Sequence, residues 1–122
     1  MQYSGTFLTK GQMITMLEKE IERRLGEMLK RRGCIYDKFV SPENPGVPDR
    51  IVTLPGGHII FLELKTEFGR LANIQKWQID RRRKMGADVR VIKGWDQAQE
   101  FVREVERLCS TIPTPISSTA KT

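Results

Sequence analysis

The sequence has few of the residues that build disulfide frameworks or zinc centres. Among its 122 residues are two cysteines, Cys34 and Cys109, and a single histidine, His58. The cysteines are far apart and form no CxxC motif, which indicates free thiols in a reducing compartment rather than zinc ligands. We therefore expect a cytoplasmic protein.

Long hydrophobic runs are also lacking. No apolar segment approaches the roughly 20 residues needed to cross a bilayer, and the N-terminal residues do not form the continuous apolar stretch of a secretory signal. These absences predict a soluble protein that does not associate with membranes. The length is typical of one domain with a single modest core.

The end of the chain differs in composition from the rest. Residues 110–122 are rich in serine, threonine and proline and contain few apolar side chains. Such a segment cannot bury enough apolar surface to offset the entropy of ordering, which predicts a disordered tail. The domain is accordingly expected to span residues 1–109.

Positive charge is in excess. The net charge is +6 and the isoelectric point is about 9.6. The segment from Lys65 to Lys93 contains nine cations and three anions, so it carries as much net charge as the whole chain. This favours an acidic partner, most commonly a nucleic acid. The predicted DNA-binding residues are Arg70, Lys76, Arg81, Arg82, Arg83 and Lys84.

The four consecutive cations of that set have an alternative interpretation. Residues 81–84 end a predicted helix, where positive charge also suits the helix dipole. Four successive helical residues cannot all face one groove, so we expect only two or three of them to contact phosphates. The others would be solvated.

Hydrophobic periodicity divides the chain into helices and strands. Apolar residues at three- and four-residue spacing predict helices over residues 11–32, 71–86 and 95–109. Short or alternating apolar runs predict strands over residues 34–40, 50–54, 59–64 and 88–93. The order of one helix, three strands, a helix, a strand and a helix predicts a layered α/β fold.

Two of the predicted strands form a hairpin that places acids side by side. If residues 55–57 (PGG) form a three-residue loop, paired residues have numbers that sum to 112, and Asp49 lies opposite Glu63. Their Cβ atoms would then be about 4.5–5.5 Å apart, with Lys65 on the same face because side chains alternate along a strand. A two-residue loop would shift the register and separate them.

Two carboxylates at this distance repel and need a compensating cation. Lys65 supplies one charge, and a structural ion pair is the simpler interpretation. A divalent ion supplies two, and Mg²⁺ prefers carboxylate and carbonyl oxygens, here those of Asp49, Glu63 and the Leu64 backbone. Bound there, Mg²⁺ would lower the pKa of a water molecule and could stabilise charge on a phosphodiester oxygen. Lys65 would position or deprotonate the water that attacks the phosphodiester.

These residues carry a resemblance to a known family. The segment 46–49 (GVPD), followed by 63–65 (ELK), resembles the bipartite motif of the PD-(D/E)xK nucleases, and the order of elements is that of their common core. The chain is more closely similar to the virus-type replication-repair nuclease (VRR-NUC) domains, which begin with a helical Glu-Ile pair, here Glu20-Ile21. They also carry a glutamine after the lysine, here Gln75. The resemblance covers roughly residues 19–102.

The resemblance implies a restriction-endonuclease-like α/β fold, a central mixed sheet flanked by helices in the order αβββαβα. It implies a catalytic set of Asp49, Glu63, Lys65, Glu20 and Gln75, with Mg²⁺ as the cofactor and Mn²⁺ as a substitute. In this family the helical glutamate, here Glu20, also serves the metal site, directly or through a water. A solvated acidic helix face is the alternative for Glu20, and a groove-lining or capping role the alternative for Gln75.

The function implied is a DNA endonuclease of replication, repair or recombination, without a nucleotide cofactor, in the cytoplasm of a bacterial cell or a phage-infected host. Stand-alone members of the group resemble junction-resolving enzymes, which implies branched DNA such as a Holliday junction as substrate. Two symmetric cuts require two sites related by a twofold axis, so a homodimer is expected, with the first helix near Gly26 as a candidate contact surface. The alternative is a non-catalytic basic DNA-binding accessory protein.

Overall fold

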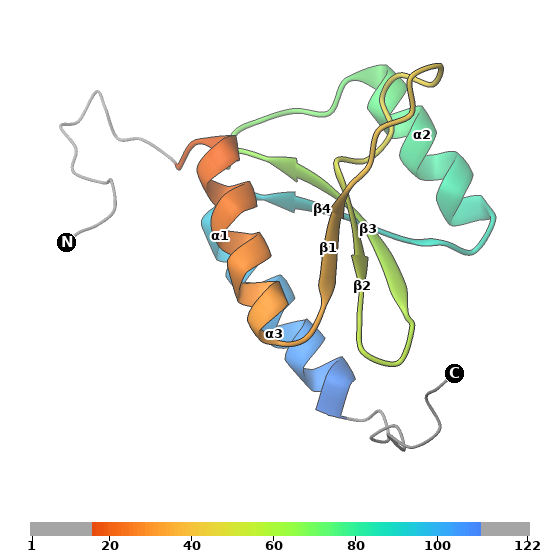
Figure 1. Cartoon of the computed structure of the whole chain (residues 1–122). Helices are drawn as coiled ribbons and strands as arrows, with labels where there is room; N and C mark the ends of the chain where they lie inside the picture. The colour runs from red at the N-terminus through yellow and green to blue at the C-terminus, as the bar shows by residue number, and fades with distance from the viewer. Residues whose placement is uncertain (1–15, 111–122) are drawn as a thin grey trace, which may run out of the picture.

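The structure is a computed structural model that describes residues 16–110. Its elements follow the predicted order (Figure 1). They are α1 (Glu18–Arg31), β1 (Ile35–Lys38), β2 (Arg50–Thr53), β3 (Ile59–Lys65), α2 (Asn73–Lys84), β4 (Asp88–Lys93) and α3 (Gly94–Ser110). The α/β prediction is confirmed. The predicted boundary of the domain and the tail, whose residues 111–122 lie outside the described part, stays a prediction.

One mixed sheet of four strands, in the order β1-β2-β3-β4, forms the centre of the molecule. β1, β2 and β3 pair antiparallel, whereas β4 pairs parallel with β3, because the connection through α2 returns the chain to the end from which β3 started. The β2–β3 hairpin has the predicted register, with Arg50 opposite Leu62 and Thr53 opposite Ile59.

The three-residue loop of this hairpin depends on its glycines. Leu54 N–H donates to the His58 carbonyl at 2.9 Å and closes the loop. Gly56 and Gly57 have φ values of 99° and 96°, which residues with a Cβ rarely adopt. The sequence PGG thus fixes the pairing of the two strands that carry the acids.

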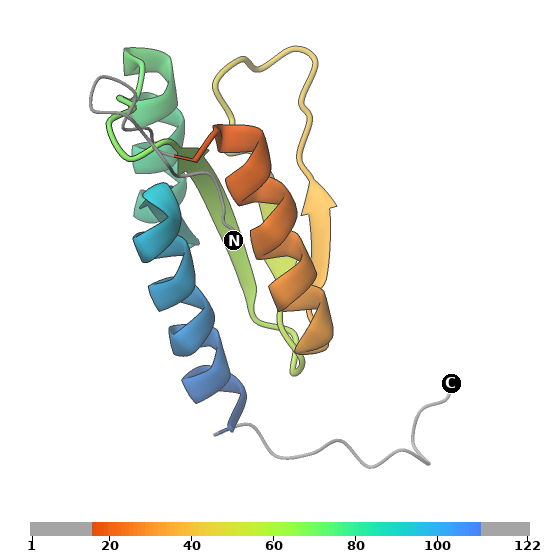
Figure 2. The same ribbon diagram turned by 90° about the vertical axis from the view of Figure 1, so that its left-hand side faces the viewer.

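The hydrophobic core lies on one face of the sheet. α1 and α3 lie side by side over this face (Figure 2). Their buried side chains interlock with those of the strands, and each contributes about 1.5–3 kcal/mol on burial. The core includes Ile21, Leu25, Leu29, Val52, Ile60, Leu62, Leu64, Ala98, Val102 and Val105. α2 lies on the opposite face (Figure 1).

Two helices are shorter than predicted. α1 begins at Glu18, since Leu17 has extended backbone with φ −65° and ψ 150°; residues 11–15 lie outside the described part. α2 begins at Asn73, and two apolar residues of the predicted helix, Ile74 and Met85, are 42% and 87% exposed. The physical reason is that α2 has no second helix beside it and buries only a narrow strip against the sheet.

Gly26, placed by the sequence analysis at a candidate dimer surface, lies instead inside the molecule. A Cβ at this position would be 2.5 Å from Cε2 of Tyr36. The tyrosine ring crosses α1 at the glycine, and its hydroxyl donates to the Glu22 carbonyl at 2.8 Å. The glycine therefore serves the packing of α1 on β1.

Within residues 16–110, no helix combines the length and the hydrophobicity required to span a bilayer.

Candidate active site

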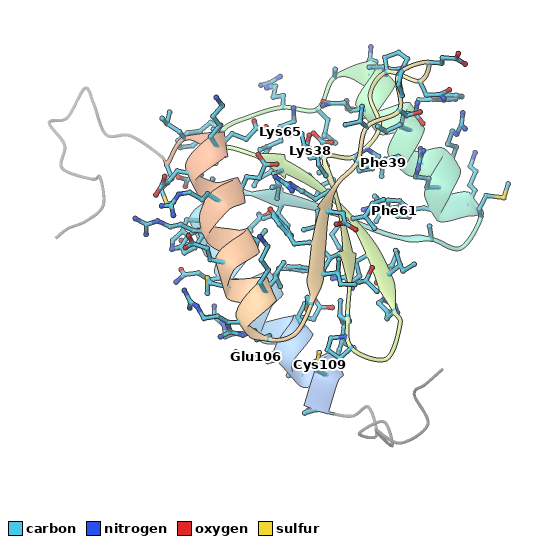
Figure 3. The ribbon with its side chains drawn as sticks, in the orientation of Figure 1. Lys38, Phe39, Phe61, Lys65, Glu106 and Cys109 are labelled. Atoms are coloured by element: carbon cyan, nitrogen blue, oxygen red, sulfur yellow. The ribbon has the colours of Figure 1, made fainter. Side chains whose placement is uncertain are left out.

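The hairpin brings three of the predicted site residues together. Leu64 N–H donates to Asp49 Oδ2 at 2.8 Å, which holds this carboxylate against β3. Lys65 Nζ lies 3.7 Å from Glu63 Oε2. Lys65 is at the end of β3 that approaches the start of α1 (Figure 3). Asp49, Glu63 and Lys65 thus form one cluster on the sheet face opposite the core.

Pro48 lies where the ladder between β2 and β3 ends, next to Asp49. The hairpin register, continued two residues beyond Arg50, places Pro48 opposite Leu64. Proline has no N–H to donate to the Leu64 carbonyl, so the ladder does not continue as a full pair there, while the Asp49 carboxylate accepts the Leu64 N–H. The amide and carbonyl of a strand residue point to the same side. The Leu64 carbonyl therefore also points toward the site, where Pro48 has no donor to offer.

α2 holds the loop that carries Asp49. The side chain of Gln78, 1% exposed, donates to the Pro45 carbonyl at 2.9 Å. Gly46 has φ 85°, and a Cβ there would be 2.9 Å from Cγ1 of Ile74 and 3.0 Å from its carbonyl oxygen. The close approach of loop and helix fixes the entry of the chain into β2.

The first turn of α2 also reaches the site through Gln75. Its Oε1 accepts the Ala72 N–H at 2.8 Å, and its Nε2 donates to Glu63 Oε2 at 2.9 Å. Because the amide oxygen is bound to a backbone donor, the NH₂ group must face the carboxylate. Gln75 therefore caps the helix and orients Glu63, so the structure brings this predicted residue into the site.

The cluster is short of positive charge. Burial, followed by the repulsion of Asp49, raises the pKa of Glu63 from 4.5 to about 8. Burial also raises the pKa of Asp49. Lys65 opposes both shifts. Glu63 is 1% exposed, and its Oε1 atom is buried without a hydrogen-bond partner among the described residues. Such an atom calls for an unseen partner.

A hard divalent cation fits this donor set. Between residues 16 and 110, no group of three or more Asp, Glu, His or Cys side chains is arranged to hold a metal ion. Mg²⁺, however, is usually bound through one or two carboxylates and keeps several waters. Asp49, Glu63 and the Leu64 carbonyl offer two carboxylates and one carbonyl oxygen, all hard ligands.

Glu20 does not join the cluster. Its Oε2 accepts from Arg23 and Arg24, both at 2.8 Å, and these hydrogen bonds lower the pKa of its carboxyl. This is the solvated helix face that the sequence analysis kept as the alternative.

Glu18 and Glu22 are the acids of α1 that approach the site. The pKa of Glu18 is raised by partial burial and then by the negative charge of Asp49, which places the two carboxylates within electrostatic reach. Glu22 is bound to Arg50 at 2.6 Å. Glu18 has no hydrogen bond or ion pair within the described part of the chain. Sequence reasoning missed Glu18, although it lies one turn before the buried Ile21.

Two residues of the basic run at the end of α2, Arg82 and Arg83, contact other parts of the molecule. Arg82 lies over the rings of Phe39 and Phe61, 5.5 and 5.9 Å from their centroids, and donates to Gln78 Oε1 at 2.6 Å. The two rings lie together between the sheet and α2 (Figure 3). Arg83 donates to the Val89 carbonyl at 2.7 and 3.1 Å.

The remaining predicted DNA-binding cations differ from these two. Arg81 stacks on the exposed ring of Trp77 at 4.6 Å. Arg70, Lys76 and Lys84 are exposed, and none forms an ion pair with another residue of the described region. Arg82 and Arg83 therefore fasten α2 to the sheet, whereas Arg70 and Lys76 lie near the end of α2 that approaches Glu63.

Comparisons with known proteins agree with the fold. A solved structure named VRR_NUC domain superposes with a TM-score of 0.67 at 29% sequence identity, over 70% of this chain and 94% of that chain. A second, named VRR_NUC domain protein, has a TM-score of 0.62 and covers 78% of this chain and 92% of its own; at 18% identity it shows the fold alone. No protein-family profile matches the chain.

A curated relative gives the same indication. The protein named "Putative nuclease p44", from Acyrthosiphon pisum secondary endosymbiont phage 1, is 52% identical over 48 residues, which are 39% of this chain. The match covers 52% of that protein, so the chain spans about half the length of the curated relative it matches. The predicted resemblance to VRR-NUC domains is confirmed, and these similarities support a nuclease.

Proposed function

Because the chain has the fold of VRR-NUC domains and a phage nuclease as a homologue, we propose that it is a metal-dependent endonuclease that hydrolyses phosphodiester bonds of DNA. The observation that carries the proposal is Glu63, buried beside Asp49 and Lys65 with an unpartnered oxygen atom. A purely structural ion pair would not leave that atom without a partner. The net charge of +6 favours the polyanionic substrate.

The residues around the metal position have distinct tasks. Asp49, Glu63 and the Leu64 carbonyl would hold Mg²⁺, or Mn²⁺, which takes similar oxygen ligands. A bound ion would polarise a phosphodiester oxygen and lower the pKa of a water molecule. Gln75 keeps Glu63 oriented through its hydrogen bond of 2.9 Å.

Lys65 supplies the remaining positive charge at the reacting group. Its Nζ lies 3.7 Å from Glu63 Oε2, and its side chain is 16% exposed, so substrate and water reach it. An ammonium group so placed donates hydrogen bonds to the attacking water or to the phosphate oxygens, where negative charge develops. Lys65 thus acts on the substrate and not as a metal ligand.

We assign to Glu18 the place beside the metal that the family resemblance suggested for Glu20. Glu18 interacts with Asp49 and Lys65 electrostatically, whereas Glu20 is held by Arg23 and Arg24. A carboxylate within electrostatic reach of the ligands would hold a metal-bound water and tune its orientation.

The proposed substrate is branched DNA, such as a Holliday junction, in replication, repair or recombination. The described elements all belong to the core fold, which leaves shape and phosphate contacts as the means of selection. Cutting both strands of a branch symmetrically calls for a homodimer with two sites related by a twofold axis.

A cleavage panel tests this proposal. The protein is incubated with a four-way junction, a flap and a linear duplex in Mg²⁺, in Mn²⁺ and in EDTA. We expect cleavage in both metals, none in EDTA, and preference for the junction. DNA binding without cleavage in either metal would support the alternative of a non-catalytic accessory protein. Equal cutting of all three DNAs would contradict the preference for branched DNA but not the endonuclease activity. Sedimentation of the protein tests the homodimer.

A further inference from the structure

Three cations from separate parts of the chain converge beside the active site. Arg70 precedes α2, Lys76 lies in its first half and Lys93 ends β4. Together with Leu71 and Val91 they line one pocket of about 340 Å³. Lys93 was not among the residues predicted to bind DNA.

The sheet register places this pocket one strand away from the catalytic cluster. In the parallel β3–β4 pair, Val91 is in register with Glu63, and Lys93 with Lys65. Neighbouring strands lie about 4.8 Å apart, and residues in register face the same side of the sheet. Lys93 and Lys65 therefore stand next to each other on the face that carries the site. β4 is the edge strand, so the pocket opens to the outside of the sheet.

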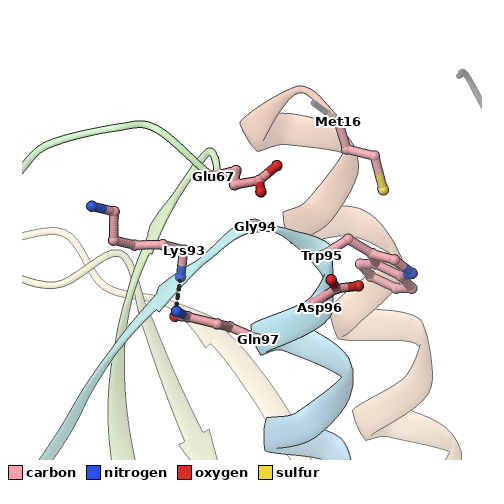
Figure 4. A pocket seen from close by; sticks show the side chains of 7 residues that line it. All are labelled: Met16, Glu67, Lys93, Gly94, Trp95, Asp96 and Gln97. Atoms are coloured by element: carbon pink, nitrogen blue, oxygen red, sulfur yellow. Dashed lines mark hydrogen bonds between the residues drawn. The ribbon is translucent and has the colours of Figure 1, made fainter. Parts of the chain in front are cut away.

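These cations are not engaged with acidic side chains in the described part of the chain. Among residues 16–110, none of the three forms an ion pair, whereas the neighbouring Arg90 binds both Asp88 and Glu104. The Lys93 backbone N–H donates to Gln97 Oε1 at 2.8 Å, and the lysine side chain extends away from Gln97 (Figure 4). Three unpaired cations around one hollow repel one another unless an anion joins them.

We infer that Arg70, Lys76 and Lys93 bind a backbone phosphate of the DNA strand, next to the phosphate that is cut. This inference rests on the proposed function. Arginine and lysine contact phosphates through their charge, and the pocket lies one strand, about 4.8 Å, from the strand that carries Glu63 and Lys65. The strand that is cut thus runs from β3 across β4, away from residues 81–84.

The first test is the salt dependence of DNA binding, measured in EDTA so that no cleavage is needed. Each phosphate contact contributes about −0.9 to the slope of log affinity against log salt. Lys93→Ala should flatten the slope by about 0.9 and weaken binding, and Lys93→Arg should restore both. Lys30→Ala is the matched control, an exposed cation about 18 Å along α1 from Glu18. A slope change no larger than that of Lys30→Ala would overturn the inference.

The second test locates the phosphate. A methylphosphonate removes the charge of one phosphate at a time on either side of the cut. The wild type should lose affinity at one neighbouring position, and Lys93→Ala should lose nothing further there. If the losses of affinity caused by the methylphosphonate and by Lys93→Ala add up, the two changes act at different places and the assignment is wrong. It is also wrong if affinity falls only when the phosphate at the end of the DNA strand is removed. Absence of cleavage with Mg²⁺ would refute the proposed function, whereas the salt-slope result, which needs no cleavage, would still show whether Lys93 contacts a phosphate.

Discussion

The two ends of α2 use polar side chains for opposite purposes. In the first turn, Gln75 turns its amide toward Glu63, and Lys76 is exposed without an ion pair in the described structure. In the last turn, Arg82 is stacked on aromatic rings and Arg83 is bound to the Val89 carbonyl. The first end completes a site, and the second attaches the helix to the sheet. A high local density of charge therefore does not by itself mark a binding surface.

This contrast between the two ends of α2 would be wrong if substitutions at both ends had the same effects on activity and stability. Substitutions at the site should remove activity and spare stability, whereas substitutions at the attachment should do the reverse. The following predictions test this separation, beginning with the largest effect.

The largest effect is expected from the carboxylates. Asp49→Asn or Glu63→Gln removes a ligand charge from the proposed metal site, so cleavage should fall by at least about 100-fold. Affinity for DNA in EDTA and the urea midpoint should be maintained or should rise, because each change relieves the repulsion between two carboxylates. Gel assays of cleavage and urea denaturation measure the two quantities. Cleavage that survives either substitution would place the site elsewhere.

A second prediction concerns pH and the metal-free protein. The pKa of Glu63 is about 8 in the folded state and 4.5 ordinarily. Between these values the folded state holds more protons than the unfolded state, so the free energy of unfolding should fall as pH rises through this window. The total fall is on the order of a few kcal/mol, at about 1.4 kcal/mol per pKa unit.

Glu63→Gln is the control, because glutamine does not titrate. Its free energy of unfolding should lack this decrease between pH 4.5 and 8, and Mg²⁺ should stabilise the wild type at pH 8 but not the variant. Denaturation curves at several pH values in EDTA provide the measurement. Parallel pH profiles for the two proteins would mean that Glu63 titrates normally.

At the other end of α2, Arg82→Ala should affect stability. The change removes a hydrogen bond to the buried Gln78 and a guanidinium stacked on two rings, at a cost of about 1–3 kcal/mol. Lys84→Ala, an exposed cation in the same turn, should change stability by less than about 0.5 kcal/mol. Urea midpoints measure both. If Arg82→Ala instead flattens the salt dependence of DNA binding without loss of stability, Arg82 contacts DNA phosphates and does not attach α2 to the sheet.

Whether sequence alone could reveal these roles depended on the distance over which each contact forms. The Asp49–Glu63–Lys65 arrangement was predictable, because three loop residues set the register of adjacent strands and thereby the faces of the side chains. Gln75 was suggested by resemblance, yet its bond to Glu63 depends on where α2 begins. Lys93 was not recognisable as a site residue, since its place beside Lys65 exists only through the β3–β4 pairing.

The basic run at the end of α2 and the acids of α1 show more clearly what sequence alone cannot predict. The contacts of Arg82 with Phe39 and Phe61 join three separate elements, and no local pattern encodes them. On α1, the choice between Glu18 and Glu20 depends on how the helix is rotated about its axis over the sheet. The predicted start of the helix was too early, and Leu17, an apolar residue within the predicted range, is 72% exposed.

The smallest effect sharpens the comparison on α1, where one acid faces the site and another faces solvent. Glu18→Gln should lower cleavage several-fold at limiting Mg²⁺ and less at saturating Mg²⁺, because a group that holds a metal-bound water changes affinity for the ion more than the chemistry. Glu20→Gln is the matched control on the same helix, and its carboxylate is already bound to Arg23 and Arg24. It should leave the Mg²⁺ dependence unchanged and change stability little, because exposed ion pairs contribute little to stability. Titrations of cleavage rate against Mg²⁺ for both variants measure the difference. A shift in the Mg²⁺ midpoint for Glu20→Gln, with none for Glu18→Gln, would reverse the assignment and show that α1 turns its other face to the metal.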